Sequence, residues 1–162
     1  MSSLKEDVLK AQQNGDIAKL YTLQQRAQNE LNEDELGRFY ANILDLALER
    51  LTETLEAARV MNMDDVQDFA TLQALYEYAL EHYSASKYTD ASALFEILGG
   101  LSGDEDFSAS MKTHQVLVDG NIDFEIFLNE MADLDEVEKN RSFYINVFTK
   151  KAQNLLDDMK AD

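Results

Sequence analysis

The middle of the sequence, residues 72–101, contains two apolar stripes at helical spacing with a short polar stretch between them. In each arm the apolar residues recur every three or four positions, as they do on one face of an α-helix. They are Leu72, Leu75, Tyr76, Ala79, Leu80 and Tyr83 in the first arm and Tyr88, Ala91, Leu94, Phe95 and Leu98 in the second. Residues 84–87 are small or polar and form the turn, and Gly99-Gly100 are expected to end the second arm with positive φ. The spacing therefore predicts a helical hairpin.

The rest of the sequence also predicts helices. Proline is absent and glycine occurs six times, so long helices are not interrupted. No segment shows the alternation of apolar and polar residues that is typical of a strand. We predict an all-α chain of about eight helices, tetratricopeptide-like in the middle. It is expected to form one domain over 1–162, with N-terminal helices at 3–60, the hairpin at 63–101 and C-terminal helices at 102–162. Capping residues mark helix starts at Ser3, Asp16, Asn32, Ser102, Asn121 and Asp133.

Two of the expected helices are unusually rich in apolar residues. The helix at 32–60 has a broad apolar face over 36–58, with Phe39 and Leu46 off its centre. A face that broad is buried against more than one neighbour. The last helix, 133–160, is the most aromatic one in the chain.

The strongly acidic composition restricts the classes of partner. The chain has 32 acidic and 14 basic residues and a net charge of −18. Such a surface is repelled by phosphate backbones and by anionic lipid, so we expect no nucleic-acid and no membrane partner. No apolar run approaches the roughly 20 residues that span a bilayer, and the N-terminus has no apolar signal region. We therefore expect a soluble, cytoplasmic protein.

One run resembles the end of a calcium-binding loop but lacks the required ligands. Asp119 and Asp123 suit such a loop, whereas its first and twelfth positions would be Gln115 and Ile126, where carboxylates are needed. We therefore interpret this run as the end of one helix followed by Asn121 as the cap of the next.

The sequence has no pattern that is typical of an active site. Cysteine is absent, which excludes a disulfide, a thiolate nucleophile and a zinc knuckle. The two histidines, His82 and His114, lie on different expected helices without a nucleophile beside them, and His82 is interpreted as a packing residue. No phosphate-binding glycine loop, HExxH motif or nucleophile elbow is present. We predict a non-enzyme without a cofactor or a metal.

The second arm of the hairpin is similar to a tetratricopeptide repeat. That repeat has a small residue where its two helices cross and an aromatic residue one turn later. Ala91 and Phe95 have this spacing, and Lys87-Tyr88 are in register, while Ser86 stands where the repeat usually has glycine. The resemblance implies an antiparallel helix pair that stacks and presents a concave, protein-binding side.

Four residues of the first arm are candidates for contact with a partner. In tetratricopeptide folds the first helix of each hairpin faces the concave groove, and Gln73, Tyr76, Leu80 and Tyr83 correspond to groove-facing positions. They would supply apolar area and hydroxyl groups that bind an extended peptide. The alternative interpretation is that Tyr76, Leu80 and Tyr83 are core residues packed under neighbouring helices.

The hairpin resembles, more specifically, the first repeat of the type III secretion translocator chaperones. Their typical pattern is LYxLAxxxYxxGKYxDAxxxFxxL, and residues 75–98 here read LYEYALEHYSASKYTDASALFEIL. This resemblance implies a groove that holds an extended segment of a secreted hydrophobic protein before export, without nucleotide, and dimerisation through N-terminal helices. The family has three such hairpins, whereas here some 70 residues precede a single one.

The sequence thus predicts a protein-binding helical-repeat chaperone or adaptor that holds an extended apolar segment of a partner. Two alternatives remain open. The acidic surface is also typical of a DNA mimic or an inhibitor of a basic protein. The broad apolar face at 36–58 would alternatively be the subunit interface of a structural homo-oligomer, such as a homodimer.

Overall fold

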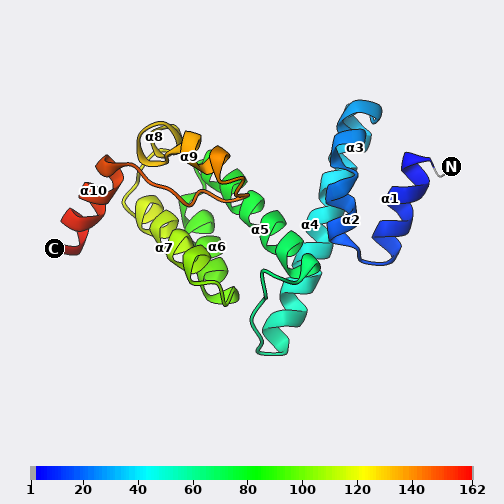
Figure 1. Ribbon diagram of the computed structural model, residues 1–162, viewed down its shortest axis with the longest axis horizontal. Coiled ribbons are helices and arrows are strands. Elements are labelled where there is room, and N and C mark those ends of the chain that lie inside the picture. Colours follow the sequence, from blue (N-terminus) through cyan, green and yellow to red (C-terminus); the bar gives the residue numbers. More distant parts are fainter. Residues whose placement is uncertain (1–2, 162) are drawn as a thin grey trace. The chain divides into compact units, whose positions relative to one another are not determined.

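The described part of the protein is built entirely from helices (Figure 1). A computed structural model describes residues 3–161. Within this range no β-strand is present, and an isolated antiparallel bridge pairs Ala132 with Phe148. The prediction of an all-α fold is confirmed, while the tetratricopeptide-like arrangement of the helices stays a prediction.

The chain forms two compact units, Met1–Leu75 and Tyr76–Asp162, where the sequence predicts one domain. The boundary lies inside helix α5 (Val66–Ser84), which belongs to both units. A continuous helix needs no proline, glycine or serine-rich linker, and for this reason the composition gives no sign of the boundary.

Unit 1 contains three short helices and one long helix before α5. They are α1 (Leu4–Gln13), α2 (Ile17–Thr22), α3 (Gln24–Glu30) and α4 (Glu33–Glu56). Three expected caps accept a hydrogen bond from the first turn of their helix, namely Ser3, Asp16 and Asn32. The expected helix at 16–29 is divided in two at Leu23, whose N–H is shared between the carbonyls of Lys19 and Leu20.

The buried face of α4 overlaps the expected one at Ile43, Ala47 and Leu51 and extends to Phe39 and Thr54. It consists of Phe39, Ile43, Ala47, Leu51 and Thr54. Phe39, expected off the centre, is 2% exposed, whereas Leu55 from the expected face is 56% exposed. Two adjacent rows of α4 are apolar, and the periodicity alone does not tell which of them lies deeper.

A buried carboxylate connects α4 to α5 within unit 1. Asp68 is 3% exposed and accepts hydrogen bonds from Arg50 Nη2 at 2.9 Å and from the backbone N–H of Asn62 at 3.0 Å. Arg59 Nη1 lies 3.6 Å from the same carboxylate. These contacts fix the loop between the two helices, because a buried carboxylate is stable only when it is paired and hydrogen-bonded.

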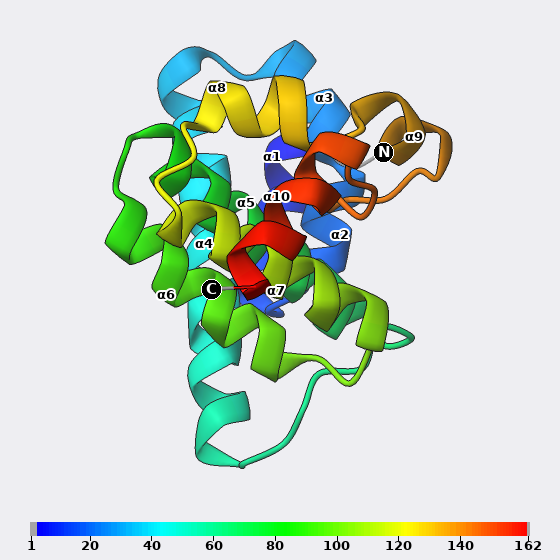
Figure 2. The same ribbon diagram turned by 90° about the vertical axis from the view of Figure 1, so that its left-hand side faces the viewer.

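Unit 2 begins with the second half of α5 and continues with shorter helices. They are α6 (Tyr88–Leu101), α7 (Glu105–Asp119), α8 (Phe124–Ile126), the π-helical turn η1 (Phe127–Met131), α9 (Leu134–Lys139) and α10 (Lys150–Ala161). Helices α6 and α7 lie side by side in both views (Figure 1 and Figure 2) and have the most extensive helix–helix contact of this unit.

The hairpin of α5 and α6 has the expected turn but not the expected end. Ser86 adopts a φ of 63°, the left-handed conformation for which glycine is usual. Ala91 and Phe95 are both fully buried. Gly99 does not end the second arm, since α6 continues to Leu101. A Cβ atom at Gly99 would lie 3.7 Å from the Cβ of Met111, an ordinary van der Waals contact, so α7 packs beside this glycine without requiring it.

Two further helix starts differ from the expected ones. Asn121 has a φ of 60° and belongs to the turn after α7, and it is Asp123 that caps α8 by accepting from the N–H of Glu125. Similarly, α7 is capped by Asp104, while Ser102 accepts from the N–H of Asp104 itself.

The expected helix at 133–160 is wrong, because residues 140–149 between α9 and α10 are not helical. Arg141 adopts a φ of 54°, and the hydroxyl of Ser142 bonds both the N–H and the C=O of Tyr144. Serine side chains compete with helical hydrogen bonds in this way. The chain from 140 to 149, called here the 140–149 segment, therefore crosses unit 2 without helical structure (Figure 1).

The revised face of α4 leads to a stability prediction. Phe39→Ala removes a buried ring and leaves a cavity, so it should lower the free energy of unfolding by about 3–5 kcal/mol. Leu55→Ala on the exposed row is the matched control and should change it by less than about 1 kcal/mol. Urea unfolding followed by circular dichroism measures both. Equal losses for the two variants would show that the buried row is assigned incorrectly.

Candidate functional site

Three elements of unit 2 meet in a chain of buried hydrogen bonds. Tyr76 Oη of α5 lies 2.8 Å from His114 Nε2 of α7 and 3.0 Å from the backbone nitrogen of Ile145 in the 140–149 segment. His114 Nδ1 lies 2.6 Å from the carbonyl oxygen of Ser110, one turn earlier in α7. Tyr76 and His114 are 1% and 0% exposed.

The partners determine where the protons lie. The carbonyl of Ser110 only accepts, so Nδ1 of His114 carries the hydrogen and Nε2 accepts from the hydroxyl of Tyr76. The hydroxyl oxygen of Tyr76 is then left to accept from the N–H of Ile145. In this arrangement every polar atom of the hydrogen-bond chain has a hydrogen-bond partner while His114 is neutral.

Burial keeps both rings in their uncharged forms. It lowers the pKa of His114 to about 4, against a small opposing effect of the hydrogen bond to Ser110. Burial likewise raises the pKa of Tyr76 above its usual value, while the N–H of Ile145 opposes this rise. Neither group exchanges protons with solvent near neutral pH, so the pair acts as a fixed donor and acceptor.

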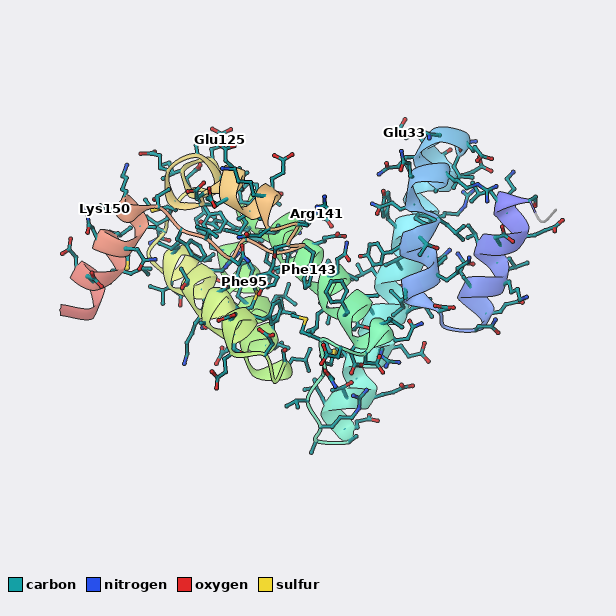
Figure 3. The ribbon with its side chains drawn as sticks, viewed as in Figure 1. Glu33, Phe95, Glu125, Arg141, Phe143 and Lys150 are labelled. Atoms are coloured by element: carbon teal, nitrogen blue, oxygen red, sulfur yellow. The ribbon has the colours of Figure 1, made fainter. Side chains whose placement is uncertain are left out.

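Aromatic rings surround this hydrogen-bond chain. The ring of Tyr76 lies 6.3 Å from that of Phe95 and 6.1 Å from that of Phe143, both labelled in Figure 3. Tyr144 lies edge-on to Tyr76 at 6.4 Å and to Phe107 at 5.0 Å. Edge-to-face pairs at these distances stabilise beyond the area that they bury. The aromatic residues of the 140–149 segment thus complete a cluster that α5, α6 and α7 begin.

A second tyrosine of α5 holds the loop after α7. The hydroxyl of Tyr83 donates to the carbonyl of Ile122, and its ring lies 5.1 Å from Phe124 and 5.2 Å from Phe127. It also lies 6.4 Å from the ring of Phe95, which connects it to the cluster around Tyr76. Burial raises the pKa of Tyr83.

The four candidate contact residues occupy different environments. Tyr76 and Tyr83 are buried, so the core interpretation accounts for both rings, and neither presents surface to a partner in this structure. Leu80 is half-buried in unit 2, and Gln73 is half-buried in unit 1. The structure brings the two tyrosines together through Phe95. The hydroxyl of Tyr76, expected to bond a partner's backbone, accepts instead from the N–H of the chain's own Ile145. Contact of these residues with a partner stays a prediction.

His114, Ser110 and Ile145 are the residues of this site that the sequence analysis does not identify. For His114 a signal exists, because it falls on the same buried face of α7 as Phe107 and Met111. Ile145 carries no such signal, since its role depends on the 140–149 segment being non-helical. His82 packs at half burial against Tyr78, with ring centroids 4.5 Å apart.

A cavity of about 470 Å³ opens beside this cluster, between α7 and the 140–149 segment. It is lined by Asp106, Ala109, Ser110, Thr113, Asn140, Tyr144, Asn146, Val147 and Phe148. The side-chain oxygen of Asn146 is buried there and finds no donor in the described part of the protein. A buried acceptor without a donor is a local cost in stability.

Other kinds of site receive no support from the described residues. Over 3–161 no three His, Cys, Asp or Glu side chains are arranged to hold a metal ion. Asp119 accepts from the hydroxyl of Ser92, and Asp123 caps α8, so both residues of the apparent calcium loop have other roles. In the same range no helix has the length and apolarity needed to cross a membrane.

Comparisons with family models, with curated protein sequences and with solved structures find no match to this chain. The resemblance of residues 75–98 to the translocator chaperones therefore depends on those residues alone. Function has to be argued from the geometry of unit 2.

The neutral state of His114 leads to a pH prediction. In the unfolded chain histidine protonates below about pH 6.5, whereas in the folded protein it does so only near 4. The unfolded state therefore binds more protons between these values, and stability is lost as the pH falls through that window. The loss attributable to His114 is about 3 kcal/mol at most.

Urea unfolding at pH 7 and pH 4.5 measures this loss. His114→Gln should show a smaller difference between the two pH values than the wild type does. His82→Gln is the matched control, in which His114 is intact and the difference should remain. If His114→Gln retains the full pH dependence, the buried neutral histidine is not its source.

Proposed function

We propose that the protein is a helical-repeat chaperone or adaptor that binds an extended apolar segment of a partner protein. One observation carries this proposal. The helices of unit 2 already hold a non-helical stretch of chain. The backbone N–H of Ile145 donates to the hydroxyl of Tyr76, and the rings of Phe143 and Tyr144 contact that of Tyr76. These are the interactions by which a helical groove recognises an extended peptide.

The hairpin of α5 and α6 supports the tetratricopeptide-like part of the proposal. The left-handed conformation of Ser86 stands at the glycine position of the repeat, and Ala91 and Phe95 are buried as in a packed repeat pair. Helix α7 packs along α6, as the first helix of a following hairpin would. On this proposal the likeness to translocator chaperones points to a secreted hydrophobic partner that is bound in the cytoplasm without nucleotide.

The net charge of −18 favours a second candidate, an inhibitor that binds a basic protein through surface carboxylates. The two candidates differ in the forces that hold the partner. Apolar burial depends little on ionic strength, whereas attraction between exposed charges is screened by salt. Salt dependence therefore distinguishes them.

The proposal predicts binding that is nearly independent of salt. Partners captured on the immobilised chain should bind with a Kd that changes less than about threefold between roughly 50 mM and 500 mM salt. Glu125→Gln with Glu138→Gln removes two exposed charges of unit 2 and should leave the Kd within about twofold. Binding that weakens more than tenfold over this salt range, and weakens again in the charge variant, would favour the carboxylate mechanism instead.

A further inference from the structure

We propose that the 140–149 segment is a built-in occupant of the partner-binding surface, and that the partner's segment binds by displacing it. This inference rests on the proposed function and assigns its regulation. The chemistry of the occupant also indicates the chemistry of the partner. The segment expected to bind is non-helical and has two aromatic residues followed by a branched aliphatic residue, as in Phe143-Tyr144-Ile145.

The contacts of the occupant explain this selectivity. Ile145 is 6% exposed, and its N–H is the donor to the buried hydroxyl of Tyr76. The ring of Phe143 lies edge-on to that of Tyr76 at 6.1 Å, and Tyr144 lies edge-on to Phe107. The surface beneath is aromatic and offers one side-chain acceptor, the hydroxyl of Tyr76, to a backbone N–H. A partner segment with the same three side chains in register would satisfy the same surface.

The 140–149 segment is attached in a way that allows exchange. Near its C-terminal end, the N–H of Thr149 donates to the carbonyl of Met131 and the carbonyl of Val147 accepts from the N–H of Asp133. These bonds flank the bridge between Ala132 and Phe148. The aromatic contacts, in contrast, come from side chains of half-buried residues, Phe143 and Tyr144. No ring of the segment is fully buried, since Phe148 is half-buried as well. Elements with little buried apolar surface are those that open while the rest of a unit stays folded.

The segment also contains a defect that displacement would relieve. The side-chain oxygen of Asn146 is buried against the cavity beside α7 without a donor in the described chain. Lifting the segment would return this oxygen to water, which restores its hydrogen bonds. The free protein thus holds an imperfect occupant, and a partner segment without a buried asparagine at this position would bind better.

Displacement has a measurable consequence for affinity. When a surface is open only part of the time, the apparent Kd of its ligand is the intrinsic Kd divided by the open fraction. Locking the segment should therefore weaken partner binding, and loosening it should strengthen partner binding. Both changes leave the helical surface itself unaltered.

An engineered disulfide locks the segment. Ala132 and Phe148 are an antiparallel pair whose flanking residues make the hydrogen bonds, and side chains are closest together at such pairs. The chain has no cysteine of its own, so Ala132→Cys with Phe148→Cys gives a single bond. The same variant in its reduced form is the matched control, because the loss of the Phe148 ring is common to both states.

The probe is a fluorescent peptide with the chain's own sequence SFYINVFT, residues 142–149. Fluorescence anisotropy should show at least tenfold weaker binding to the oxidised variant than to the reduced one. A peptide with alanine at the positions of Phe143 and Tyr144 should bind neither form. Equal binding of the first peptide to both forms would overturn displacement but leave the proposed function standing.

A second variant loosens the segment without a cross-link. Phe143→Ala with Tyr144→Ala in the protein should strengthen binding of the same probe by at least fivefold, with the helical circular dichroism retained. Lys139→Ala with Lys150→Ala, at exposed positions on either side of the segment, is the matched control and should bind as the wild type does.

Two other outcomes contradict the inference. In the first, the probe binds neither the reduced nor the loosened protein, while salt-independent capture of a partner persists. The partner would then bind elsewhere, and the proposed function would stand without displacement. Light scattering that shows a dimer for the reduced form and a monomer for the oxidised form, with no probe binding, would make a second copy of this chain the occupant.

Discussion

The organisation of unit 2 depends on one buried hydrogen-bond chain, from the N–H of Ile145 through Tyr76 and His114 to the carbonyl of Ser110. Because a buried polar group without a partner is costly, these atoms fix the distance between α5 and α7 and the position of the 140–149 segment. The surrounding rings supply the apolar area. The polar chain selects one arrangement among the many in which those rings would pack.

The sequence predicts the parts of the fold that local periodicity determines. Helical class, the turn at Ser86 and the burial of Ala91 and Phe95 follow from spacing and propensity. The break after Lys139 does not, since Phe143, Tyr144 and Phe148 fit a helix pattern equally well. Their non-helical backbone depends on contacts with α5 and α7, which are distant in sequence. For the same reason the sequence does not predict the role of Ile145. His114 is recognisable from the sequence as a buried residue but not as a hydrogen-bond partner of Tyr76.

The two tyrosines of α5, expected to contact a partner, make their hydrogen bonds within this chain. Their hydroxyls bind backbone groups of non-helical chain, at Ile145 and at Ile122, as groove-facing tyrosines would. Both groups belong to this same chain, and burial follows from that. The surface proposed for a partner is thus defined by the 140–149 segment that covers it. A partner has to compete with this segment, which belongs to the same chain and therefore has a high effective concentration.

The exchange rate of the Ile145 amide proton tests this account most directly, since that proton reports the bond to Tyr76 in solution. Measured by nuclear magnetic resonance in deuterated buffer, it should be protected at least tenfold more in the wild type than in Tyr76→Phe. That variant lacks the hydroxyl that accepts from Ile145 and donates to His114. An Ile145 amide that exchanges in the wild type as fast as the exposed turn at Arg141, or equally fast in both proteins, would contradict the central role of this hydrogen bond.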